Sequence, residues 1–260
     1  MSGPPHTETI EDVLEALREV VDDSAADESR VGYFAALYRQ VTVGIARAID
    51  AGAFDDGERM SRLGAAFGNR YLEALHAWRS GGRPNRSWRT SFRAADDARP
   101  VVVQHLAIGV NAHVNLDLPI SAARLCPGDA IAGLKRDFDL INGILVTVLS
   151  ELQARLAGLS PLLGALDVVL GRLDEEIVGF NVRKARSEAW DAAVLLARQP
   201  ADAQDATEKM LDRYANGLAR VVLAPPFPLP AALDVLRSTE WTGVAATIRM
   251  LDGPPGVTGG

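Results

Sequence analysis

The chain has 260 residues, of which 48% are hydrophobic and 23% are charged, and its formal net charge is -7. This length provides enough apolar material for one large domain or two small ones. An acidic chain lacks the overall positive field that binding to nucleic acid or anionic lipid requires, which argues against both classes of partner. The single cysteine, Cys126, excludes an intramolecular disulfide and fits a reducing compartment.

The first residues, MSGPPHTETIEDVLEAL, have no basic flank and no long apolar core, so we predict that they are not a signal peptide. The chain contains no uninterrupted apolar run of about 18 residues, the length that a membrane-spanning helix needs. We therefore expect a cytoplasmic protein without a membrane span.

Apolar residues recur at helical spacing through most of the chain. In the first such segment they include Ile10, Val13 and Leu17, and Thr9 with Asp12 resembles an N-terminal cap. The further helices that the spacing predicts lie within 28–52, 55–82, a short piece around Trp88 and Phe92, 100–118, 134–156, 160–180, 183–200, 202–223 and 231–251.

The predicted fold class is all-α, an irregular multi-helix bundle with one central helix that carries polar residues. Alternating strand patterns and hairpin turns do not stand out in the sequence. We expect a disordered N-terminus (1–8), a single helical domain (9–252) and a flexible tail (253–260). The one candidate domain boundary is GLSP at 158–161, but its short length favours a single domain.

The expected central helix contains QHLAIGVNAHVNLDLP, residues 104–119, and is predicted to end before Pro119. His105, Gly109, His113 and Asp117 follow one another at four-residue intervals and would form one stripe. Gly109 would open a slot between the two imidazoles. A carboxylate one turn away from His113 would fix the tautomer of that ring and raise its basicity, as a general base or a metal ligand requires.

The two histidines of this helix are two turns apart, roughly 12 Å along the axis, so they do not form a simple chelate by themselves. Asn111 and Asn115 form a second pair on another face, where they would orient polar atoms of a substrate or bond to a neighbouring helix. Apolar residues surround the helix on every side, which predicts that it is buried. The alternative to a site is a polar network that satisfies itself within the core.

Polar residues on two other expected helices complete the candidate set. Asp137 would supply a carboxylate to His105 or His113, or else form an edge salt bridge with Lys135 or Arg136. Asn142 lies at a core margin of the same helix.

Earlier in the chain, Asn69 and Tyr71 are candidates for binding a substrate. On this helix Arg70 is placed to pair with Glu73.

Five stretches together resemble an uncharacterised family, Domain of Unknown Function 5995: FGNRYLEAL, SWRTSF, QHLAIGVNAHVNLDLP, KRDFDLIN and ARSEAWDAA. The resemblance spans roughly residues 9 to 200 and implies an all-helical protein, but no established reaction. It places the following residues at the polar motif positions of the family: Asn69, Tyr71, His105, Asn111, His113, Asn115, Asp117, Asp137 and Asn142.

Three functions remain open on these residues. The first is an enzyme that acts on a small, largely apolar organic substrate, with His113 held by Asp117 as general base or acid and His105 as a second proton donor or acceptor. Hydrolysis, dehydration, isomerisation and cyclisation all suit such a set. The second is a hydrolase in which His113, Asp117 and Asp137 hold one divalent metal ion. The third is a non-enzymatic protein that binds a small molecule; the sequence leaves an oligomeric state open in every case.

Overall fold

The computed structural model describes residues 6–157, 182–226, 229–239 and 243–253. Within these ranges every regular element is helical and no strand occurs, which confirms the predicted all-α class. The α-helices are α1 (Ile10–Ala26), α2 (Val31–Asp50), α3 (Gly57–Arg79), α4 (Arg86–Ala95), α5 (Val102–Ala112), α6 (Leu118–Leu125), α7 (Lys135–Ala157), α8 (Val182–Arg198), α9 (Ala201–Leu223), α10 (Leu229–Thr239) and α11 (Val244–Asp252).

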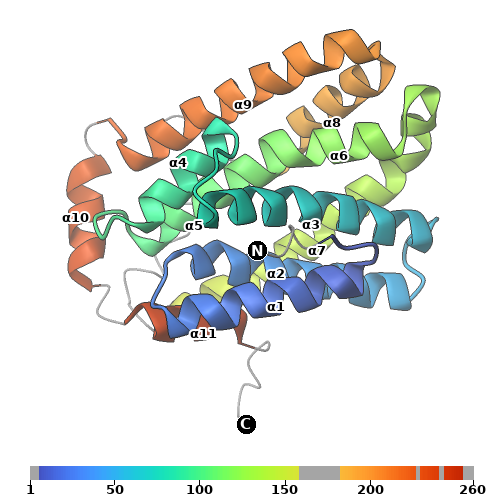
Figure 1. Cartoon of the computed structure of the whole chain (residues 1–260). Coiled ribbons are helices and arrows are strands. Elements are labelled where there is room, and N and C mark those ends of the chain that lie inside the picture. Colours follow the sequence, from blue (N-terminus) through green and yellow to red (C-terminus); the bar gives the residue numbers. More distant parts are fainter. Residues whose placement is uncertain (1–5, 158–181, 227–228, 240–242, 254–260) are drawn as a thin grey trace.

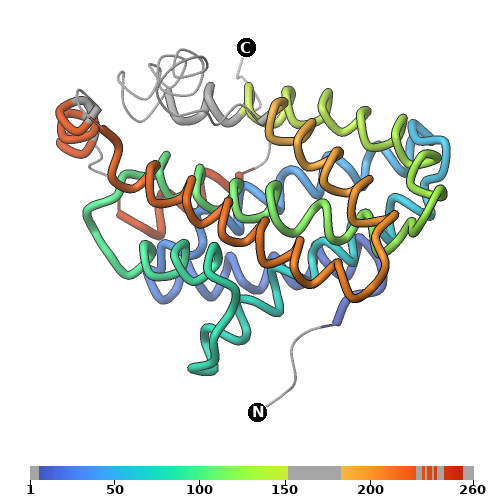
Figure 2. Tube along the Cα trace, turned by 90° about the horizontal axis from the view of Figure 1, so that it is seen from above, coloured from blue at the N-terminus to red at the C-terminus, as the bar shows by residue number. Residues whose placement is uncertain are grey.

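The long helices lie side by side in layers, and α10 runs across one end of them (Figure 1). The continuous segment formed by α5 and α6 lies in the middle. It packs against α2, α3 and α4 on one side and against α8 and α9 on the other. Seen from above, α9 runs over this central segment (Figure 2). None of the helices in the described ranges is both long and apolar enough to cross a membrane.

The central segment is buried, as its apolar residues predict, but it does not end before Pro119. A π-helical turn, His113–Asp117, joins α5 directly to α6, and the Leu118 N–H donates to the His113 carbonyl five residues back. The chain therefore stays helical to Leu125. Pro119 lies in the first turn of the α-helical piece that follows the π-helical turn, the part of an α-helix in which proline is best tolerated.

Local signals set the other helix ends. Thr9 and Asp12 form the expected capping box at the start of α1. Gly52 follows α2 with φ +67°, a conformation that glycine adopts without strain. Thr7, expected to belong to a disordered N-terminus, is instead buried, and its backbone N–H donates to the Asn69 side chain at 2.9 Å.

Several expectations fall on residues that the structure does not describe. These are the helix predicted at 160–180, the boundary at 158–161, residues 1–5 and residues 254–260. The helical portion expected at 231–251 is divided into α10 and α11, and α11 packs against α1 and α2.

Candidate functional site

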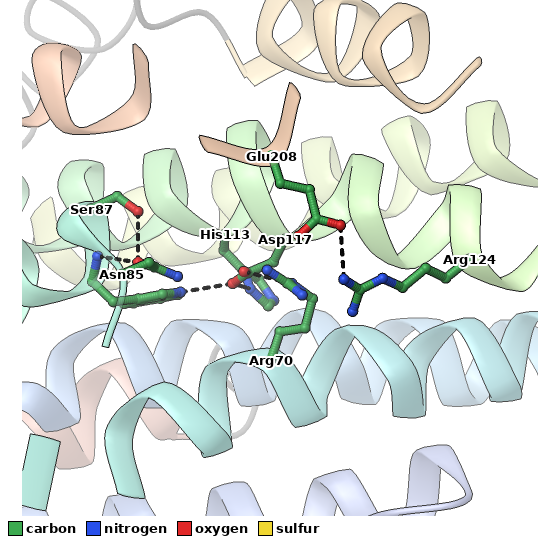
Figure 3. Close-up of polar contacts among 8 residues, drawn as sticks. Arg70, Asn85, Ser87, His113, Asp117, Arg124 and Glu208 are labelled. Carbon is green, nitrogen blue, oxygen red and sulfur yellow. Dashed lines mark hydrogen bonds and ion pairs between the residues drawn. The ribbon is translucent and has the colours of Figure 1, made fainter. Parts of the chain in front are cut away.

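The π-helical turn places a fully buried carboxylate, Asp117, among three donors from three elements. Its Oδ1 accepts from Arg70 Nε of α3 at 3.0 Å. Its Oδ2 accepts from Trp88 Nε1 of α4 at 2.8 Å and lies 3.2 Å from His113 Nδ1. Figure 3 shows Arg70, His113 and Asp117 pointing toward one another. We call Arg70, Trp88, His113 and Asp117 together the Asp117 cluster.

The start of α4 fixes Trp88 in this cluster. Asn85 caps the helix, and its Oδ1 accepts from the Trp88 backbone N–H at 3.0 Å and from Ser87 Oγ at 3.0 Å (Figure 3). An asparagine cap satisfies a backbone donor at the first turn, which sets where the helix begins. The indole is fully buried, so its N–H requires an acceptor, and Asp117 supplies one.

The partners of His113 determine its tautomer. Since a carboxylate only accepts hydrogen bonds, Nδ1 carries the hydrogen and Nε2 keeps a lone pair. Burial lowers the pKa of His113, an effect that the hydrogen bond and the charge of Asp117 oppose and that Arg70 reinforces. Nε2 is buried and has no hydrogen-bond partner among the described residues. The ring is therefore a neutral, oriented base with one unused acceptor.

Aromatic rings enclose this imidazole. Phe67 stacks on it, with ring centroids 3.5 Å apart and planes 13° from parallel. Tyr38 meets it edge-on with centroids 4.3 Å apart, and Phe34 does so at 5.6 Å. This enclosure excludes water from the ring and accounts for the lowered pKa.

His113 also lines a cavity of about 100 Å³ at the junction of α2, α3, α7, α8 and the central segment. We call it the apolar cavity, because its other lining side chains are almost all aliphatic or aromatic, among them Leu37, Met60, Ile141 and Leu145. Among the described residues, Arg186 of α8 is the one charged side chain in its wall. A concave apolar space with few polar groups is the usual form of a small-molecule site.

Gly109 does not form an open slot between the two histidines. A Cβ atom built on it would lie 2.5 Å from Phe34 Cδ2. The ring of Phe34 on α2 therefore occupies the space that the missing side chain leaves. The glycine allows two helices to pack closely.

His105 lies apart from His113, against Tyr33, with ring centroids 5.6 Å apart. It shares with Tyr71 a space of about 10 Å³, which fits one water molecule and no organic substrate. His105 Nε2 and the Tyr71 hydroxyl are both buried and unpartnered among the described residues. Burial lowers the pKa of His105 to about 4, and the charge of Arg30 adds to this. The expected role of His105 in catalysis requires a cavity that it shares with His113 and that holds a substrate. The space beside His105 is too small for this.

The two asparagines of the central segment bind protein instead of facing the apolar cavity. Asn111 Nδ2 donates to the Ala215 carbonyl of α9 at 2.7 Å. Asn115 Nδ2 donates to Asn111 Oδ1 at 2.9 Å. This geometry matches the second role that the sequence suggested for the pair, a hydrogen bond to a neighbouring helix.

Asp137 is fully buried but has a site of its own. Its carboxylate accepts from the backbone N–H groups of Asp55 and Asp56 at 2.7 and 3.2 Å, and from Arg59 at 2.8 Å. Neither expectation for Asp137 matches this arrangement, because its ion pair is with Arg59 and its contacts do not include a histidine. In the described part of the chain, no three His, Cys, Asp or Glu side chains gather as metal ligands would.

The remaining candidates also bind protein groups. Asn69 holds Thr7 through both ends of its amide, accepting from the Thr7 N–H and donating to the Thr7 carbonyl at 2.9 Å each. Asn142 Oδ1 accepts from Arg186 Nε at 2.6 Å and so positions a residue of the apolar cavity.

A family model matches residues 10–225, with the description "Family of unknown function (DUF5995)". The chain belongs to this family. No curated protein and no solved structure matches the chain. The range matched by the DUF5995 family includes the whole Asp117 cluster and Arg186, while α10 and α11 lie beyond it.

Three residues of this region, Arg70, Trp88 and Arg186, were not among the candidate site residues of the sequence. Arg70 was expected to pair with Glu73, yet it reaches across to Asp117. Trp88 lies in the family-like stretch SWRTSF, which was a signal for its importance but not for its partner. Arg186 lies in ARSEAWDAA, where periodicity places it on the buried face with Ala185 and Ala189.

Proposed function

We propose that the protein is an enzyme in which His113 transfers a proton to or from a compact, largely apolar organic molecule bound in the apolar cavity. The observation that carries the proposal is a buried imidazole whose Nδ1 is held by Asp117 and whose Nε2 has no hydrogen-bond partner in the described part of the chain. A buried polar atom without a hydrogen bond is uncommon in folded proteins, and a substrate would supply the missing partner.

The Asp117 cluster supports a base at this position in two ways. Asp117 holds Nδ1–H, so that the lone pair stays on Nε2, and it stabilises the imidazolium that forms when Nε2 accepts a proton. Arg70 and Trp88 fix the carboxylate, so the ring does not have to reorganise during the reaction.

Access to Nε2 depends on the aromatic enclosure. Because Nε2 is buried, we expect the stacked ring of Phe67 to shift when a substrate enters the cavity that both side chains line. A substrate that displaces this ring would replace a stacking contact with its own apolar contacts. The reaction classes that suit a single oriented base here are isomerisation, dehydration, cyclisation and hydrolysis.

The test is a turnover screen with benzene-sized ketones, alcohols, epoxides and esters in D₂O, read by mass spectrometry for deuterium uptake or for gain or loss of water. His113→Gln is expected to lower the rate of any active class by about 10² to 10⁴, because general base catalysis contributes that much. Circular dichroism should retain the helical signal of the unchanged protein.

The matched control is His76→Gln, the same substitution near the end of α3, outside the apolar cavity. It should keep full turnover. Equal activity in His113→Gln and the unchanged protein would remove His113 from the chemistry. Binding of these molecules without turnover of any class would favour a ligand-binding protein instead.

A further inference from the structure

Arg186 is a buried cation that has no buried counter-charge among the residues that the structure describes. The residue is 4% exposed, and its guanidinium lies over the Phe138 ring with Cζ 4.3 Å from the centroid. Nε donates to Asn142 Oδ1 at 2.6 Å and Nη2 donates to the Phe138 carbonyl at 2.5 Å. Both partners are neutral. Within the described residues, no carboxylate lies within ion-pair distance of this arginine.

A guanidinium in this position is costly unless a charge compensates it. Buried charges in proteins are normally paired, since desolvation penalises the charged form. The same burial lowers the pKa of Arg186 to about 10, and the charge of Asp139 only partly opposes the effect. Asp139 itself is half exposed and pairs with Lys135.

The guanidinium of Arg186 is held in place, but not all of its N–H groups donate hydrogen bonds to the described residues. Nη1 makes no hydrogen bond to the described residues, while Nε and Nη2 are fixed by protein acceptors. The side chain contributes to the wall of the apolar cavity, which His113 also lines. An immobilised guanidinium with free N–H groups is suited to bind an oxyanion, because little side-chain entropy remains to be lost.

We propose that Arg186 is the anion anchor of the apolar cavity and that its ligand is a compact, otherwise apolar molecule with one carboxylate group. This inference rests on the proposed function, since it names the substrate class of the same cavity. At about 100 Å³ the cavity is smaller than the apolar cavity of about 150 Å³ that holds benzene, so it suits a short branched acid as it stands and a single-ring acid only once the Phe67 ring has shifted. One cation with few free donors matches a monoanion better than a phosphate ester, which carries more charge and more acceptor oxygens.

The experiment measures equilibrium binding of two matched pairs, benzoate with benzamide and isovalerate with isovaleramide, by calorimetry on the full chain. Each acid and its amide have nearly the same shape, so their difference reports the charge. For at least one pair we expect the acid to bind at least tenfold more tightly than the amide.

Arg186→Met keeps the length of the side chain and removes its charge. It should abolish the preference for the acid while the amide still binds, and a thermal melt should show stability unchanged or raised. If this variant does not fold, Arg186→Lys serves instead. It keeps the charge without the planar fork and should weaken acid binding at least several-fold.

Two results would overturn the anchor: equal binding of acid and amide in both pairs, or no binding of any of the four probes. His113→Gln should keep the preference for the acid over the amide, because it alters the cavity wall for both probes alike and leaves the charge of Arg186 in place. A protein that prefers the acids but turns over no substrate would therefore refute the proposed catalysis while leaving the role of Arg186 intact. Turnover of neutral substrates without any preference for the acid would refute the role of Arg186 while leaving the proposed catalysis intact.

Discussion

Asp117 and Asp137 are both fully buried, and each is held by an arginine, yet their surroundings differ in kind. Asp137 receives two backbone N–H groups just before α3 and thereby ties the loop after α2 to α7. Asp117 accepts hydrogen bonds from the ring N–H groups of Trp88 and His113, and the imidazole of His113 is titratable. Burial and an arginine partner therefore do not distinguish these two carboxylates, whereas the identity of their other donors does.

The partners also differ in their access to water. Asp55 is exposed and Asp56 is partly exposed, so both can hydrate if Asp137 is lost. Trp88 and His113 are 0% and 4% exposed and have no such recourse. The same substitution should therefore affect the two sites to different extents.

The largest expected effect comes from truncating each carboxylate. Asp117→Ala should lower the free energy of unfolding by about 3–5 kcal/mol, as expected when one partner of a buried ion pair is removed. Asp137→Ala should cost about 1–3 kcal/mol, because its former partners reach solvent. Urea denaturation followed by circular dichroism measures both, and equal losses would contradict the contrast between the two sites.

A second contrast, between the two buried histidines, sharpens the first. His113 has a carboxylate that opposes the lowering of its pKa, whereas His105 has a hydrogen bond to the Pro100 carbonyl and no carboxylate within ion-pair distance among the described residues. The pKa of folded His105 is about 4, below its ordinary value of 6.5. Between these two pKa values His105 is protonated in the unfolded chain but not in the folded chain. The free energy of unfolding therefore falls as the pH drops through this window.

We expect this effect of His105 to approach about 3 kcal/mol between pH 6.5 and 4, at about 1.4 kcal/mol for each unit of pKa. Denaturation midpoints measured across this window should fall less steeply in His105→Gln than in the unchanged protein. A curve of the same slope in both proteins would show that His105 is not the group excluded from protonation.

The smallest expected effect concerns the packing of Phe34 against the helix that carries His113. Gly109→Ala should lower stability by about 1–2 kcal/mol, because the clash with Phe34 outweighs the gain in helix propensity of about 1 kcal/mol. The control is Gly143→Ala on α7, where a new Cβ meets nothing within 4 Å and the same gain should appear alone. Thermal unfolding should move in opposite directions for the two variants.

The fold class, most helix positions and the buried central helix follow from spacing alone, since apolar periodicity reports which faces are covered. The partner of His113 was also predictable, because Asp117 lies four residues along the same helix. Contacts between distant elements were not predictable in this way. Spacing does not show that Arg70 reaches across to Asp117 or that the space at Gly109 belongs to a ring on α2.

The π-helical turn has a consequence for how the two halves of the molecule are built. In an α-helix each residue turns the chain by about 100°, so one extra residue rotates everything that follows by that amount. Before the turn, Val103 and Leu106 belong to one hydrophobic cluster with α1, α2 and α4. After it, Leu118 and Ile120 belong to another with α7 and α8. The turn thus rotates the buried face of one continuous helix, so that the helix packs into two hydrophobic clusters. His113 and Asp117 lie where these two clusters meet.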